Sequence, residues 1–334
     1  MRSDKPLRLA WAIILTAAAT VSVLAQPEAS DPCRAKFHSP GDLSLTIALK
    51  GDQAVFQRGE IIPIIETYSA SSHLKYIWNS KSYDRSGRAD GLETFCLQPA
   101  VGQDPLDEYF AAQQFLSGGG LFSMLRLGPE KQTIEIELNE WLELPPGNYT
   151  LRLIGYRAIT GREEATADWN KPAIPARSNQ INFSIVDAEP DWQASQLAAA
   201  IRTLDSPAAS REAKMHAQRI IRFLGTDAAL QEAVRRFAAT PNDAATWEYD
   251  AAIWGAAQPE RSIDLIKAEL ERNQGSSNKY LVWTLAELEI QSDPAQKQMR
   301  IESQSKDGAS ELDREANELN RRVQHYRERY GLPE

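Results

Sequence analysis

Hydrophobic and polar residues alternate along the first half of the chain. The alternation is clean over residues 43–49 and 133–138. Strand-like runs also cover residues 61–68, 149–156 and 179–186, and turn-forming residues punctuate the region. Strict alternation predicts strands with one buried face. Because no amphipathic helix intervenes between the runs, we expect residues 43–187 to form an antiparallel β-sandwich, with an insertion over residues 71–127.

The period changes after residue 187. Apolar residues now recur three and four positions apart, which predicts amphipathic helices over residues 188–334. Prolines suited to a first helical turn are separated by 34 residues (Pro207 to Pro241) and by 35 residues (Pro259 to Pro294). This spacing is typical of helix-pair repeats, and the region resembles HEAT-like α-solenoids. A plain helical bundle is the alternative.

The last predicted helix covers residues 311–330. Its apolar residues are spaced alternately four and three apart, but the pattern lasts for fewer than the three to four heptads that indicate a coiled coil. We therefore expect a C-terminal capping helix that packs on the last repeat. Dimerisation through this helix is the alternative.

Three segments of the strand-rich half carry a family resemblance. They are Phe56-Gln-Arg-Gly-Glu60 before an apolar strand, the turn and strand of residues 144–153, and the last strand, residues 178–185. The region resembles the immunoglobulin-like sandwiches of macroglobulin-type and proteinase-inhibitor-type domains in bacterial exported proteins. The resemblance implies an immunoglobulin-like fold and gives no function, because one fold hosts many functions.

The N-terminus has the pattern of a secretory signal peptide. Arg2, Lys5 and Arg8 precede an almost uncharged apolar run that ends in Val23-Leu24-Ala25. Val23 and Ala25 are small residues at the two positions that a signal peptidase inspects, and the polar segment Gln26-Pro27-Glu28 follows, so we expect cleavage after Ala25. A retained membrane anchor is the alternative, since the run approaches the ~20 residues that span a bilayer. We expect a secreted or periplasmic protein with an N-terminal arm over residues 26–42.

Composition sets further limits. The 334 residues contain 37 Lys and Arg against 46 Asp and Glu, and 42% of the chain is hydrophobic. This is ordinary for a folded protein of about two domains. Removing residues 1–25 changes the formal charge from −9 to −11, because three basic residues and one acidic residue are lost. An acidic chain lacks the basic surface of a nucleic-acid-binding protein. No later apolar stretch approaches the ~20 residues of a membrane span.

Export also bears on the two cysteines. In an oxidising compartment an even number of cysteines predicts a disulfide, here between Cys33 and Cys96. Closing this loop would stabilise the fold by roughly 4 kcal/mol in the chain-entropy model. Two unpaired thiols are the alternative.

No motif for metal or cofactor chemistry is present. The four histidines are scattered, and the chain has neither His-Glu-x-x-His nor Gly-x-Ser-x-Gly. The glycines of Ser117–Gly120 lack the rest of a phosphate-binding loop. We expect no catalytic site, no cofactor and no metal.

Candidate contact residues lie in two places. In the insertion, Tyr76 and Trp78 could stack on a sugar, and Asp84, Arg85 and Arg88 form a polar segment in which arginine could bind a carboxylate or a sugar. A hairpin loop held by its own ion pairs is the alternative for these three charged residues.

The second place is the helical half. There Trp247 and Trp254 are candidate hot spots for a protein partner. Burial between helices is the alternative for them.

The preferred interpretation is an exported, non-catalytic protein-binding or scaffold protein that acts through its helical-repeat face and its sandwich loops. A rival hypothesis is an extracytoplasmic hydrolase that uses Asp104, Asp107 and Glu108. A third is a carbohydrate-binding module in the 71–127 region. The sequence does not identify the partner or the oligomeric state.

Overall fold

A computed structural model of the chain describes residues 33–34, 39–72, 75–81, 88, 91–112, 124–160, 172–241, 247–275, 278–295 and 309–332. The expected signal peptide, its cleavage site and the Ser117–Gly120 loop lie outside these residues. The strands and the helices belong to one compact unit, Phe37–Glu334, and are not two separate bodies. Among the helices of the described residues, none is both long enough and apolar enough to cross a membrane.

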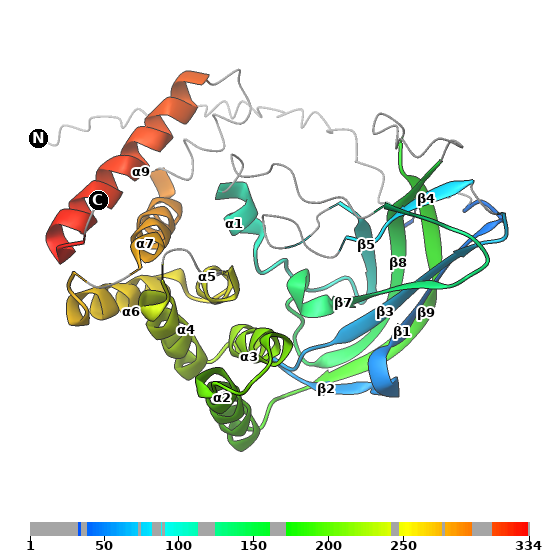
Figure 1. The fold of residues 1–334 in the computed structure, drawn as a ribbon, viewed down its shortest axis with the longest axis horizontal. Coiled ribbons are helices and arrows are strands. Elements are labelled where there is room, and N and C mark those ends of the chain that lie inside the picture. Colours follow the sequence, from blue (N-terminus) through cyan, green and yellow to red (C-terminus); the bar gives the residue numbers. More distant parts are fainter. Residues whose placement is uncertain are drawn as a thin grey trace, which may run out of the picture. The chain divides into compact units, whose positions relative to one another are not determined.

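The strands form two sheets (Figure 1). One sheet has the order β1-β3-β7, and the other has the order β2-β9-β8-β4-β6, with β5 also paired to β8. Their bounds are β1 (Leu43–Leu49), β2 (Val55–Gln57), β3 (Pro63–Ala70), β4 (Tyr76–Asn79), β5 (Glu93–Gln98), β6 (Met124–Arg126), β7 (Gln132–Glu137), β8 (Gly147–Thr160) and β9 (Ile174–Val186).

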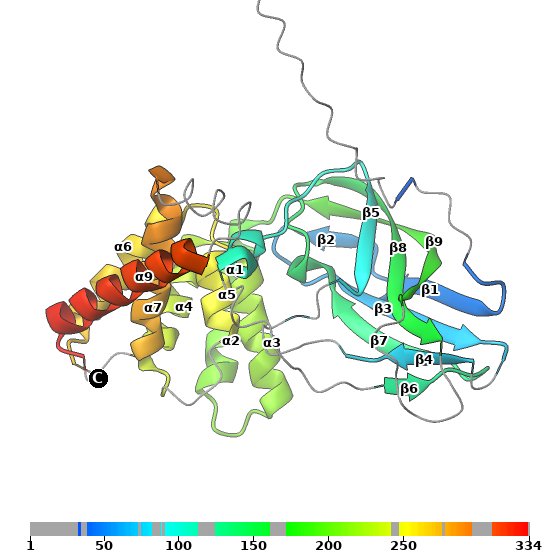
Figure 2. The same ribbon diagram turned by 90° about the horizontal axis from the view of Figure 1, so that it is seen from above.

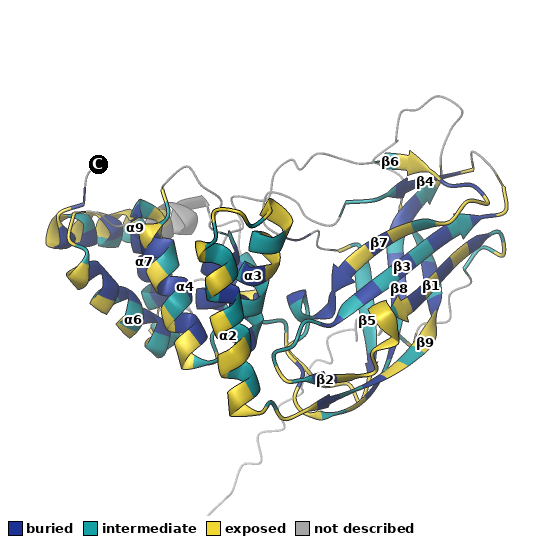
Figure 3. Ribbon diagram, turned by 60° about the horizontal axis from the view of Figure 1, so that its bottom comes forward, coloured by how far each residue is buried: buried dark blue, intermediate teal, exposed yellow. Residues whose placement is uncertain are grey.

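Alternation along the strands reports burial as expected. Buried and more exposed residues succeed one another along β1 and β3 (Figure 3), so one face of this sheet supplies the core. Ile64 of β3 lies opposite Ile136 of β7, and both are buried. The second sheet contributes Leu151 and Phe183 to the same cluster. A shared core between two sheets is the basis of a sandwich.

Among the described strands, neighbours pair in the predicted antiparallel direction with one exception. β2 runs parallel to β9, with Phe56 opposite Ile185. This pairing joins residues far apart in the sequence, and local alternation carries no information about it. The outer edge of β2 is covered by side chains: Gln53 donates to the Val55 carbonyl (2.9 Å), and the Gln57 amide donates to Glu60 (2.8 Å).

One asparagine joins the two sheets. The Ile47 amide of β1 donates to Asn179 Oδ1 (2.7 Å), and Asn179 Nδ2 donates to the Ile47 carbonyl (3.0 Å). The Asn179 side chain of β9 thus satisfies both main-chain groups of a β1 residue. It replaces a strand neighbour at this edge.

After β9 the chain is helical. The helices are α2 (Pro190–Asp205), α3 (Arg211–Leu224), α4 (Asp227–Ala239), α5 (Trp247–Trp254), α6 (Pro259–Arg272), α7 (Lys279–Ser292) and α9 (Ala309–Tyr330). They gather at one end of the sheets (Figure 2). The short helix α1 (Asp107–Ala112) lies in the predicted insertion, between β5 and β6.

Local signals explain where these helices begin and end. Pro259 occupies the first turn of α6, as expected. Gly225 ends α3 in the left-handed region (φ 61°), and Thr226 then caps α4 by accepting from the Ala229 amide (3.2 Å). The turn between α3 and α4 therefore needs only Gly225 and Thr226.

Neighbouring helices stack in pairs. α3 packs on α5, α4 on α6 and α6 on α7. Two polar contacts join residues 34 positions apart: Arg261 with Asp227 (3.0 Å) and Thr284 with Asp250 (2.7 Å). Both separations equal the 34-residue spacing from Pro207 to Pro241. α9 packs on α7 and buries Val323 in the helical core.

Candidate functional site

The junction between the strands and the helices is held by a segment of the predicted insertion. Leu106 and Tyr109 lie in the strand-rich half of the sequence but belong to the helical core, where both are buried. The Tyr109 ring lies 5.2 Å from the Trp247 ring and 5.6 Å from the Trp254 ring. We call residues 104–112 the clamp segment, because it fastens α5 to the sandwich.

Arg88 anchors the start of the clamp segment. Its guanidinium donates to Asp104 Oδ1 (2.8 Å) and to the Glu140 carbonyl (2.6 Å), and it lies 4.3 Å from the Phe110 ring centre. Asp104 also accepts from the Leu106 amide (2.9 Å). Arg88 is only 3% exposed, so these contacts use its charge inside the protein.

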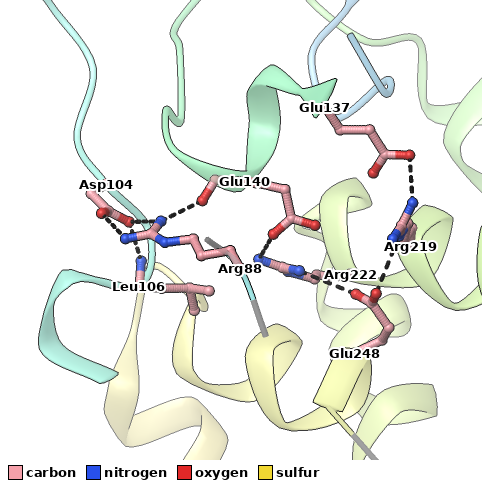
Figure 4. Close-up of polar contacts among 8 residues, drawn as sticks. All are labelled: Arg88, Asp104, Leu106, Glu137, Glu140, Arg219, Arg222 and Glu248. Carbon is pink, nitrogen blue, oxygen red and sulfur yellow. Dashed lines mark hydrogen bonds and ion pairs between the residues drawn. The ribbon is translucent and has the colours of Figure 1, made fainter. Parts of the chain in front are cut away.

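A second set of polar residues forms a buried ion network (Figure 4). Arg222 of α3 pairs with Glu140 (2.7 Å) and with Glu248 of α5 (3.1 Å). Arg219, one turn earlier, pairs with Glu137 at the end of β7 (2.9 Å) and with Glu248 (3.2 Å). We call these five residues the junction network.

Burial governs the electrostatics of the network. Desolvation raises the pKa of Glu137 to about 7, although Arg219 opposes the shift and Glu140 adds to it. Desolvation also raises the pKa of Glu140, against the attraction of Arg222. Buried carboxylates avoid charge unless enough cations face them. Both shifts therefore mark an incomplete balance of charge at the junction.

Two clefts flank the junction. The acidic cleft has a volume of about 290 Å³, and its lining includes Glu60, Glu135 and Glu137 from the strands and Trp192, Gln196 and His216 from the helices. The turn cleft has a volume of about 260 Å³, and its lining includes Arg58 and Glu143 from the strands and Gln193 and Arg222 from the helices. Gly59, Glu60 and Leu224 line both clefts, so they adjoin.

Gly59 sets the spacing between the two halves. Its φ of +87° lies in the region that favours glycine, and a Cβ atom at this position would lie 2.9 Å from the Phe223 carbonyl oxygen of α3. The β2–β3 turn and the end of α3 thus touch main chain to main chain. No larger residue fits there without moving the helix.

The predicted contact residues of the insertion are mostly inside the protein. Tyr76 and Trp78 are each 1% exposed and belong to the sandwich core, and the Tyr76 hydroxyl donates to Asp42 (2.7 Å). Their rings fill space between the sheets and offer no face to a sugar. Asp84 and Arg85 lie outside the described residues.

The predicted contact tryptophans of the helical half, Trp247 and Trp254, also pack inside the protein. Trp254 is 7% exposed, and Trp247 is half-buried against Tyr109 and Phe110 of the clamp segment. The hypothesis of a free aromatic surface for a partner is replaced by an internal contact. Aromatic residues of this kind dominate interfaces, and this interface lies within the chain.

The three acids of the hydrolase hypothesis do not converge. Asp104 is engaged by Arg88, whereas Asp107 and Glu108 lie exposed on the first turn of α1. Among the described residues, no group of three or more His, Cys, Asp or Glu could hold a metal ion.

Cys33 and Cys96 form a disulfide, as predicted.

A further charged cluster lies within the sandwich. Arg157 of β8 pairs with Glu93 of β5 and lies 3.6 Å from Glu66 of β3, and all three side chains are at most 1% exposed. Burial and the charge of Glu93 raise the pKa of Glu66 to about 8, although Arg157 opposes the shift. Glu66 therefore retains its proton near neutral pH.

Comparisons with known proteins assign no family. No protein-family model and no curated protein matches the chain. One solved structure is similar, the crystal structure of BslA, described as a bacterial hydrophobin. The sequence identity is 14% and the TM-score is 0.20, over 44% of this chain and 98% of that chain. A TM-score this low carries no argument about fold or function.

Proposed function

We propose that this chain is an exported, non-catalytic protein-binding protein whose partner lies along the junction between strands and helices. One observation carries the proposal: the acidic cleft and the turn cleft adjoin, and each is lined by side chains from both halves. Binding sites occur preferentially where two structural layers meet. A site of this kind needs a fixed geometry, and the clamp segment and the junction network supply it.

We further propose that the two sheets are an immunoglobulin-like sandwich and that the helices are a HEAT-like array. The shared core between the sheets supports the first assignment. Stacked helix pairs with contacts 34 residues apart support the second. In such an architecture the two halves supply different walls of one groove.

We also propose that the chain is exported from the cytoplasm. The basic residues, the apolar run and the small residues before Gln26 support cleavage of a signal peptide after Ala25. The disulfide between Cys33 and Cys96 supports an oxidising compartment, because such bonds persist there. A secreted or periplasmic location follows from the two together.

The partner contacts the clefts rather than the aromatic residues favoured by the sequence. Trp247 and Trp254 are occupied by Tyr109. The polar walls of the clefts suit a protein surface, since interface rims are polar and hydrated.

A photo-crosslinking experiment tests the proposal on the intact chain. We would place benzoylphenylalanine at Gln196 in the acidic cleft and at Gln193 in the turn cleft, and expose each variant to the native exported fraction. The same exported protein should crosslink at both positions and then bind the purified chain. The experiment keeps the helices in place. A chain without them would expose Glu137 and Glu140, which are buried and pair with Arg219 and Arg222 of α3 in the intact protein.

Two control positions make the result specific. Leu125 of β6 is 44% exposed, and Tyr280 of α7 is 46% exposed; neither lines a cleft described above. Crosslinking of the same protein at these positions with equal yield would contradict the junction as the site. No crosslinked protein at Gln193 or Gln196 would contradict the proposed function itself.

A further inference from the structure

Among the described residues, the junction network holds more carboxylates than cations. Three carboxylates, Glu137, Glu140 and Glu248, face two guanidinium groups, Arg219 and Arg222. Each guanidinium group already contacts two of these carboxylates, so two positive charges are shared among three negative charges. Fixed buried charges are stabilised only when opposite charges face them. In the part of the chain that the structure describes, the network therefore has one carboxylate more than it has guanidinium groups.

Among the three carboxylates of the network, Glu137 is the one that lines a cleft described above. It is 7% exposed and lines the acidic cleft. Its Oε1 accepts from Arg219 (2.9 Å), but its Oε2 is buried and has no hydrogen-bond partner. An unsatisfied buried carboxylate oxygen costs free energy until a donor arrives. The raised pKa of Glu137, caused first by burial, agrees with this geometry.

The rest of the acidic cleft adds negative charge and an aromatic wall. Glu135 pairs with Lys50 (2.8 Å), whereas the donors to Glu60 among the described residues are two neutral groups, Gln53 Nε2 and the Gln57 amide. Cleft and network together hold five carboxylates against three cations among the described residues, with His216 neutral. The half-buried Trp192 on α2 lines the same cleft.

We propose that the acidic cleft binds a lysine or arginine side chain of the partner polypeptide, and that this cation completes the junction network at Glu137. The methylene groups of such a side chain would pack against Trp192, where an aromatic ring favours a cation as well. A charged hydrogen bond to a buried carboxylate is stronger than a neutral one. This inference rests on the proposed function, since it names the group that the partner presents.

Model peptides test the inference on the full mature chain. Acetyl-Gly-Gly-Lys-Gly-Gly-amide would be titrated into ¹⁵N-labelled protein, and its uncharged norleucine counterpart would be titrated in parallel. We expect the lysine peptide to shift the Trp192 indole resonance and to bind at least tenfold more tightly than the norleucine peptide. Glu137→Gln should remove that difference, whereas Glu130→Gln, at an exposed turn, should keep it.

Each other outcome overturns the inference. Equal binding of the norleucine peptide would show that the cleft does not select a cation, and a lysine preference that survives Glu137→Gln would place the cation elsewhere. Acetyl-lysine-methylamide that binds as tightly as the pentapeptide would assign the cleft to small amines. Absence of any shift would also refute the inference, while crosslinking at Gln193 and Gln196 would still uphold the proposed function. The comparison of the two peptides on the unaltered chain needs no variant to fold.

Discussion

Glu66 offers the sharpest test of the buried electrostatics. Its pKa rises from 4.5 to about 8 because β3 buries it inside the sandwich and beside Glu93 of β5, while Arg157 of β8 opposes the rise. Tyr68 lies in the same cluster, and burial and the two carboxylates raise the pKa of its hydroxyl as well. We expect Glu66→Gln to stabilise the fold at pH 8 and to have little effect at pH 5.

The sign and size follow from proton linkage. A carboxyl whose pKa is higher in the folded chain binds its proton more tightly when folded, so it contributes stability below pH 4.5 that is lost as the pH rises to 8. With pKa values of 4.5 unfolded and about 8 folded, the loss between pH 5 and pH 8 is about 3.5 kcal/mol. Glutamine has no proton to lose, so the variant escapes this cost.

Urea unfolding of both chains at pH 5, 6, 7 and 8 measures the effect. The difference in unfolding free energy between variant and wild type should grow by roughly 3 kcal/mol across this range. Glu137 and Asp250, whose pKa values are raised to about 7 and about 6, occur in both chains and cancel in the difference. Glu130→Gln, at an exposed turn, should give a flat difference. An equally flat difference for Glu66→Gln would refute the reasoning.

Three further predictions concern the packing of the two halves. Tyr109→Ala should lower the unfolding free energy by about 3–5 kcal/mol because it empties an aromatic contact at the junction, whereas Tyr280→Ala should change it by less than about 0.5 kcal/mol in the same urea titration. Gly59→Ala should cost about 2 kcal/mol or more through its positive φ and its contact with α3, against about 1 kcal/mol for Gly51→Ala, which meets nothing; equal losses would contradict the close contact. Reducing the disulfide should cost about 4 kcal/mol because the unfolded chain gains conformational entropy, measured by urea unfolding with and without reductant; an unchanged midpoint would contradict this chain-entropy estimate.

The sequence predicted elements well and long-range contacts poorly. The alternation in residues 133–138 located β7, because a strand with one buried face leaves a local signature. It could not distinguish Glu135 from Glu137, which point to the same side of that strand. Glu135 stays exposed and Glu137 is buried, because α3 covers only the end of the strand.

The candidate site shows the same limit. The aromatic residues of the helical half were found, because their mass within a short stretch is visible in the sequence. Their partner was missed, since nothing local connects Trp247 to Tyr109. The sequence holds a weak signal for two buried charges. Arg222 lies beside the apolar stripe of Ile221 and Leu224 on α3. Glu66 alternates in phase with the buried Ile64 and Tyr68 on β3. Charge at an inward position marks a buried ion pair.

The clamp segment has a consequence for the order in which the chain folds. Asp107, the first residue of α1, precedes Trp247, the first residue of α5, by 140 residues. Leu106 and Tyr109 therefore leave the ribosome, or a translocation channel, long before the helices that bury them. Until α5 arrives, the strands carry an uncovered apolar patch, and a partly emerged chain is prone to aggregation there. A holding chaperone that binds this patch would protect the nascent chain and would be displaced when α5 docks.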